Sequence, residues 1–98
     1  MLFAVILRDK PGQGALRAEQ LPQHLEWLDH HSTEIIVAGS LRHEPGDVPL
    51  GGLWVVEAEH KEQVVALLQE DPFFVCGLRE SYDVLHWSKA FPDRSVPV

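Results

Sequence analysis

The chain of 98 residues has little cysteine, few basic residues and no long apolar run. Its single cysteine, Cys76, excludes an intrachain disulfide and fits a reducing cytoplasm. Eight Lys and Arg stand against 15 Asp and Glu, and a formal net charge of -7 disfavours nucleic acid or an anionic membrane surface as a partner. The longest apolar run, Leu2 to Leu7, is far shorter than the roughly 20 residues that span a bilayer, and the basic leader and cleavage site of a signal peptide are missing. We therefore expect a cytoplasmic protein with neither membrane nor nucleic-acid partner.

What is present suits one compact domain. A hydrophobic content of 45% is enough for a single core. We expect the domain to cover residues 1–91, followed by a polar, proline-containing tail at 92–98 that is loosely held. Six histidines are the unusual item for this size.

The spacing of apolar residues predicts four strands and three helical segments. Strands are expected at 2–7, 34–38, 53–58 and 81–87, helices at 21–31 and 61–70, and a short helix that follows Asp71-Pro72 and stops at Gly77. Residues 13–20 are expected to form a flexible link with Arg17 near its end, and residues 41–52 a loop. The order β-α-β-β-α-β is that of a ferredoxin-like α+β domain with a four-stranded antiparallel sheet.

The first predicted strand is apolar at every position, so both of its faces should be buried. Helices would cover only one face of the sheet. We therefore expect a homodimer in which two sheets pack face to face.

One histidine and one aspartate form the candidate catalytic pair. Asp71 precedes proline at a helix start, where its carboxylate can accept an orphan backbone N–H. His24 lies beside the Leu21, Leu25 and Leu28 stripe of the first helix, an edge position that suits a side chain facing a cleft. A nearby carboxylate would orient the imidazole and favour its protonated form, which suits a general acid or base. The alternatives are a surface histidine without a role and an ordinary N-cap.

Several short features, in their order and separation, resemble the YciI-like (YCII-related) family. They are the apolar first strand, Arg17 seven positions before His24-Leu25, Ala38-Gly39-Ser40 at the end of the second strand, and Asp71-Pro72-Phe73. The resemblance covers residues 1–91. It implies a dimeric α+β barrel with His24 and Asp71 as the active-site pair. Some relatives act on chlorinated aromatic ring-cleavage or dehydrochlorination substrates, and the wider barrel class includes muconolactone isomerases and small monooxygenases.

Two further residues are candidates for substrate binding. Arg17 could hold a carboxylate or phenolate in its planar fork of donors, although a solvated arginine is the commoner case. Ser40 could donate a hydrogen bond to a substrate or only shape the turn, and it stands where many relatives of the family carry proline. Five aromatic residues could line a pocket but are more often core or dimer contacts: Trp54, Phe73, Phe74, Tyr82 and Trp87.

No histidine spacing supports a metal site. His30 and His31 are adjacent and diverge by about 100° on a helix, and His24 lies two turns from His31. We also expect no cofactor. The leading hypothesis is a small-molecule enzyme of lyase, dehydrochlorinase or isomerase type that uses the His24 and Asp71 pair. Its alternatives are a non-catalytic dimeric metabolite-binding module and a purely structural dimer. The substrate, the reaction and the pathway are open at this stage.

Overall fold

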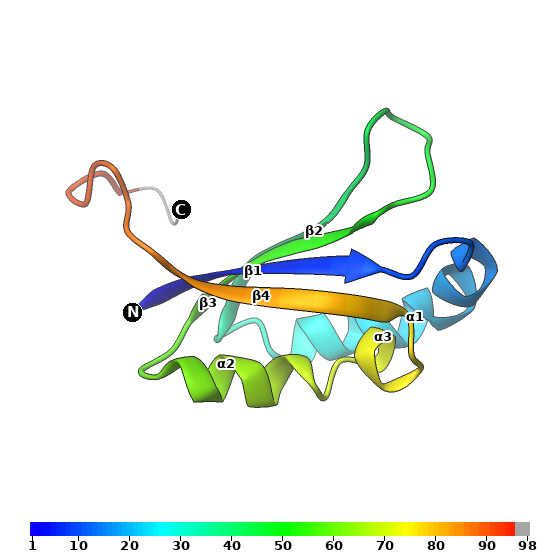
Figure 1. Ribbon diagram of the computed structural model, residues 1–98. Helices are drawn as coiled ribbons and strands as arrows, with labels where there is room; N and C mark the ends of the chain where they lie inside the picture. Colours follow the sequence, from blue (N-terminus) through cyan, green and yellow to red (C-terminus); the bar gives the residue numbers. More distant parts are fainter. Residues whose placement is uncertain (96–98) are drawn as a thin grey trace.

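The computed structural model describes residues 1–95. Its elements are, in chain order, β1 (Leu2–Asp9), α1 (Gly14–His30), β2 (Ile35–Leu41), β3 (Gly51–Glu57), α2 (Lys61–Leu68), α3 (Pro72–Val75) and β4 (Arg79–Trp87). The strands form one antiparallel sheet in the order β2-β3-β1-β4, and all three helices lie against the same face of it (Figure 1). The ferredoxin-like α+β fold expected from the sequence is confirmed.

The core lies between the sheet and the helices. Alternate residues of β1 face the helices, because side chains of a strand alternate between its two faces. Phe3, Val5 and Leu7 are each 2% exposed or less. They pack with buried residues of the neighbouring elements: Ile35, Trp54, Val56, Val64, Leu68 and Val84.

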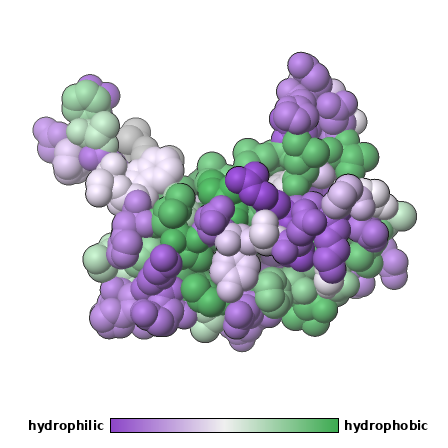
Figure 2. Space-filling view, in the orientation of Figure 1, coloured by the Kyte–Doolittle hydropathy of each residue, from purple (hydrophilic) through white to green (hydrophobic). Residues whose placement is uncertain are grey.

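The opposite face of the sheet carries no helix, and its middle is apolar. Ala4 is paired across the sheet with Val55 and Leu85, and cross-strand partners share a face. On the edge strands this face is open, since Leu85 is 53% exposed and Val37, the other partner of Val55, is 47% exposed. Figure 2 shows hydrophobic residues on this upper side, between the C-terminal segment and the hydrophilic tip of the β2–β3 hairpin.

The expected flexible link before the first helix is wrong. Residues 14–20 are the first two turns of α1, so Arg17 lies in a helix. The segment Ala15 to Gln20 consists of strong helix formers, and their summed preference outweighs the two glycines before it. Pro22, expected in the first turn or at a break, lies inside α1 on an exposed side, where water can bond the carbonyl that proline leaves unpaired.

The loop between β2 and β3 is shorter than expected, because both strands run further into the hairpin. Gly51 and Gly52 belong to β3 and pair with Arg8 and Leu7 of β1. A Cβ on Gly51 would lie 1.8 Å from the carbonyl oxygen of Leu7, so glycine is required there by the approach of the two backbones. β4 likewise begins two residues early, at Arg79.

Within residues 1–95 no helix is long and apolar enough to span a bilayer. The loosely held tail expected at 92–98 falls in part on residues 96–98, which lie outside the described residues.

The contact at Gly51 can be tested against a second glycine of the same hairpin. Gly51→Ala should lower the free energy of unfolding by about 1–3 kcal/mol or more, because the added methyl meets backbone that cannot move aside. Gly39→Ala is the control, since a Cβ at Gly39 meets nothing within 4 Å. Urea unfolding of both variants measures the difference, and equal stabilities would contradict the assigned β1–β3 register.

Candidate active site

Asp71 is a fully buried carboxylate at the start of α3. It is 0% exposed, and Pro72 follows it at the first helical position. Its Oδ1 accepts a hydrogen bond from the backbone N–H of Phe73 at 3.0 Å, the N-cap contact expected from the sequence. A buried carboxylate is tolerated only when its oxygens are bonded, so the other contacts of Asp71 decide whether the cap is its only role.

His24 reaches Asp71 from the neighbouring helix α1. It is the buried residue of α1, and its Nδ1 lies 2.6 Å from Oδ1 of Asp71. The imidazole also stacks on the ring of Phe73, with centroids 4.0 Å apart and planes 15° from parallel. Two side chains 47 positions apart are thus held in one geometry by a hydrogen bond and by ring packing. Catalytic use of the pair stays a prediction.

The hydrogen bonds of Asp71 determine which nitrogen of His24 carries the proton. An ionised carboxylate can only accept, so Nδ1–H is the donor in the 2.6 Å bond. A neutral His24 then has its lone pair on Nε2. Within the described residues no group bonds to Nε2, and it is not among the buried atoms without a partner. Nε2 therefore reaches open space and is the atom able to exchange a proton with a ligand.

A chain of ion pairs extends from Asp71 to Arg17. Oδ2 of Asp71 accepts from Arg79 at 3.4 Å, and Arg79 donates to Oδ1 of Asp9 at 2.7 Å. Oδ2 of Asp9 accepts from Nε of Arg17 at 3.1 Å. Two carboxylates and two guanidiniums therefore alternate behind His24, and their charges cancel without a contribution from the histidine.

Asp9 and Arg79 were not among the residues that the sequence indicated. They lie at the end of β1 and the start of β4, which pair antiparallel, so they face each other as a cross-strand pair. An acid just after the first predicted strand and a base just before the last one was the available signal. The cost of the arrangement is visible at Nε of Arg79, the one buried side-chain nitrogen or oxygen of the described residues without a hydrogen-bond partner.

The pair opens on a cleft of about 300 Å³ between α1, β2 and β3. The Leu21, Leu25 and Leu28 stripe lines this cleft instead of being wholly buried in the core, and Leu25 is 54% exposed. The sequence-predicted residues Arg17, His24 and Ser40 all border the cleft, with Asp71 behind His24. Trp54 is both a core residue and part of the wall, whereas Phe73 is buried beneath His24.

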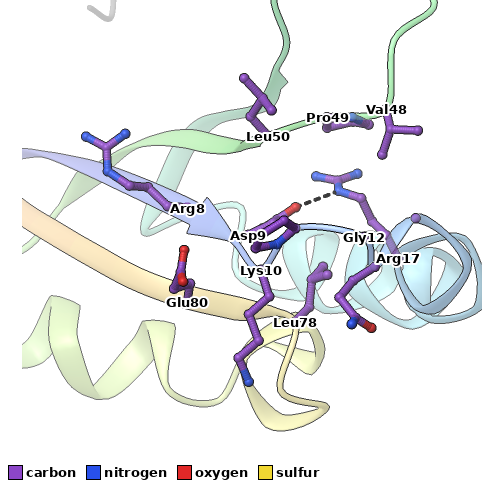
Figure 3. Close-up of a pocket in the computed structure, with 13 residues that line it drawn as sticks. Arg8, Asp9, Lys10, Gly12, Arg17, Val48, Pro49, Leu50, Leu78 and Glu80 are labelled. Atoms are coloured by element: carbon purple, nitrogen blue, oxygen red, sulfur yellow. Dashed lines mark hydrogen bonds and ion pairs between the residues drawn. The ribbon is translucent and has the colours of Figure 1, made fainter.

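A second, wider hollow of about 460 Å³ adjoins the cleft at Arg17 (Figure 3). It lies between the β1–α1 loop and the chain that leads into β3, where Val48, Pro49 and Leu50 face the Asp9–Arg17 pair. Neither His24 nor Asp71 borders it. The candidate pair therefore belongs to the smaller cleft and not to this hollow.

Among the residues that the structure describes, no three His, Cys, Asp or Glu side chains are grouped so as to hold a metal ion. His31 instead lies 3.9 Å from Glu34 and packs on Trp27. His60 begins α2, where its backbone N–H is bonded by Gln63.

The fold and the site define a ferredoxin-like α+β domain with a buried histidine–aspartate pair at one cleft. The chain belongs to the YCII-related domain family, whose model matches residues 1–88. No curated protein sequence is significantly similar to the chain.

Two solved structures show the same fold. The 5-chloro-2-hydroxyhydroquinone dehydrochlorinase TftG of Burkholderia phenoliruptrix AC1100, in complex with 2,5-dihydroxybenzoquinone, is 28% identical, with a TM-score of 0.81 over 90% of this chain and 94% of that one. Protein Atu4242 of Agrobacterium tumefaciens is 12% identical, with a TM-score of 0.52 over 94% and 98% of the two chains, a likeness of fold alone.

The two roles of Asp71 can be separated by a pair of substitutions. Asp71→Ala removes the cap and leaves Arg79 and His24 without a shared acceptor, so it should cost about 3–5 kcal/mol of unfolding free energy. Asp71→Asn keeps an oxygen for the cap and should cost about 1 kcal/mol less. Urea unfolding of both variants tests this, and an alanine variant as stable as wild type would show that the buried network contributes nothing.

Proposed function

We propose that this protein is a small-molecule enzyme in which His24 is the general acid and base and Asp71 orients it. The observation that carries the proposal is the buried 2.6 Å contact of the pair beside a cleft bordered by His24. The reaction would be of lyase, dehydrochlorinase or isomerase type, on a small organic substrate with aromatic-derived compounds among the candidates.

The geometry suits a proton transfer at Nε2 of His24. A proton taken from the substrate makes the ring an imidazolium, and the Asp71 carboxylate at Nδ1 stabilises that charge without moving. An isomerase would return the proton to another atom of the substrate. In a dehydrochlorination the proton and the chloride leave together as HCl, so no oxidant is needed.

Arg17 and Ser40 are proposed to hold the substrate. Nε of Arg17 is bonded to Asp9, while its two terminal nitrogens have no partner among the described residues. Ser40 accepts a hydrogen bond from Arg42, which leaves its hydroxyl proton for a ligand.

The similarity to a dehydrochlorinase supports this chemistry. That enzyme binds 2,5-dihydroxybenzoquinone, and at 28% identity the two chains cover nearly all of each other. We carry over the reaction class and the kind of ligand as a proposal for this chain.

We also propose that the protein works as a homodimer joined through the uncovered face of the sheet. That face presents Val37, Leu41 and Leu85 at 43–53% exposure, and exposed apolar residues on an uncovered sheet face are typical of an interaction surface. A second copy has the same apolar face and would cover it isologously.

The alternative is a dimeric binding module without turnover. It is favoured by the fact that Asp71 already has structural partners, the α3 cap and Arg79, whether or not a reaction occurs. Such a module would bind a metabolite in the same cleft and release it unchanged.

Chloride release from 5-chloro-2-hydroxyhydroquinone, corrected for release without protein, tests the proposed chemistry. His24→Ala should lower kcat by about 10²–10⁴-fold, because it removes the proton acceptor. His30→Ala is the control, an exposed histidine of the same helix, and it should leave kcat unchanged. Full turnover by His24→Ala would overturn the role of the pair. A ligand bound without turnover, and bound as well by His24→Ala, would favour the binding module.

Analytical ultracentrifugation tests the dimer. Leu85→Asp places a charge on the uncovered sheet face and should shift the protein from dimer to monomer at micromolar concentration. Val75→Asp is the matched control, because Val75 is 72% exposed on α3 at the helical side. A monomeric wild-type protein would refute the proposal.

A further inference from the structure

Basic side chains are concentrated at the cleft beside His24. Three of the chain's eight Lys and Arg residues border it, namely Arg17, Arg42 and Arg79. None of the 15 Asp and Glu does, although all of them lie in the described part of the chain. In a protein of net charge -7, a cleft with arginines and no acid on its wall is an exception to the general surface.

The positive charges of two of these arginines are already neutralised by carboxylates that do not border the cleft. Arg17 pairs with Asp9, and Arg79 pairs with both Asp9 and Asp71. The pairs fix the guanidiniums in place, and Arg17 and Arg79 also lie 4.9 and 5.0 Å from the centroid of the Phe73 ring. Their charge is balanced by these carboxylates, so neither residue adds net positive charge to the cleft.

Arg42 is different, because its charge has no counterpart. It follows the last residue of β2, and within residues 1–95 it donates hydrogen bonds to the hydroxyl of Ser40 and to the backbone carbonyl of Asp47, the latter at 3.4 Å. Both partners are neutral groups. The guanidinium is therefore held over the cleft beside Ser40 as an unneutralised positive charge.

Apolar residues make up another part of the cleft wall. They are Leu21, Leu25 and Leu28 of α1 and Trp54 of β3. A free inorganic anion would gain nothing from that wall, whereas an organic ring or chain would bury apolar surface against it.

We propose that the cleft selects a small organic anion whose planar oxyanion group, a phenolate, enolate or carboxylate, binds Arg42 and Arg17 while its apolar body lies against the leucines and Trp54. Arg42 is the residue that discriminates charge, since a guanidinium fork matches a planar oxyanion and no carboxylate competes for it. The inference rests on the proposed function in that it names the substrate class of the same cleft. It would hold equally for a binding module.

The test compares two quinones of the same ring by isothermal titration calorimetry. 2,5-Dihydroxybenzoquinone ionises readily to an anion, whereas 2,5-dimethoxybenzoquinone stays neutral. The wild-type protein should bind the anion at least about 10-fold more tightly, and raising the salt from about 50 to 300 mM should weaken binding of the anion only.

Arg42→Gln removes the charge and keeps an amide for Ser40. It should abolish most of the preference for the anion and leave the affinity for the dimethoxy compound unchanged. Lys61→Gln, the same change of net charge at the start of α2, should alter neither affinity. Arg42→Lys keeps the charge without the fork and should retain part of the preference.

Equal affinities for the two quinones, no measurable binding of the anion, or equal effects of Arg42→Gln and Lys61→Gln would each overturn the inference. The outcomes for the proposed enzyme are separate. Anion selectivity that depends on Arg42 without any turnover would leave the substrate class standing and overturn the enzyme. Turnover that depends on His24 without any preference for the anion would do the reverse.

Discussion

The contacts of one buried carboxylate join most parts of this site. Asp71 is closed off from solvent, and its two oxygens accept from α3, from His24 of α1 and from Arg79 of β4. Burying such a charge costs several kcal/mol unless its lone pairs are hydrogen-bonded. All three donors therefore contribute to stabilising the same carboxylate. The orientation of His24, the start of α3 and the beginning of β4 are consequences of satisfying this single group.

The three arginines that border the cleft differ in the partners they bind. Arg79 belongs to the buried network, because its terminal nitrogens bridge Asp71 and Asp9. Its Nε is buried without a hydrogen-bond partner. Arg17 donates from Nε to Asp9, and its two terminal nitrogens have no hydrogen-bond partner among the described residues. Arg42 contributes nothing to the buried network and is held by neutral groups. The three arginines thus range from one held by two carboxylates to one that makes no ion pair within residues 1–95.

Much of this could be predicted from the sequence, for identifiable reasons. Strand alternation and Asp71-Pro72 are local signals, and they located the sheet and the cap correctly. The early start of α1 was missed because the two glycines near Arg17 were weighted above the helix formers that follow them. Asp9, Arg79 and Arg42 were missed because their roles arise from strand pairing and from the curve of a hairpin, which residue spacing does not encode.

The alternation of charges behind His24 has a consequence for how such proteins diverge. A change at Arg79 alone would remove one partner from both Asp9 and Asp71, so the effects of substitutions in the buried network depend on one another. Leu21 and Leu25 are half exposed on the cleft wall, and Arg42 bonds only neutral groups. Substitutions are therefore tolerated most readily on the wall and the rim, where related chains can acquire new ligands while the buried contact of His24 with Asp71 beneath them is kept.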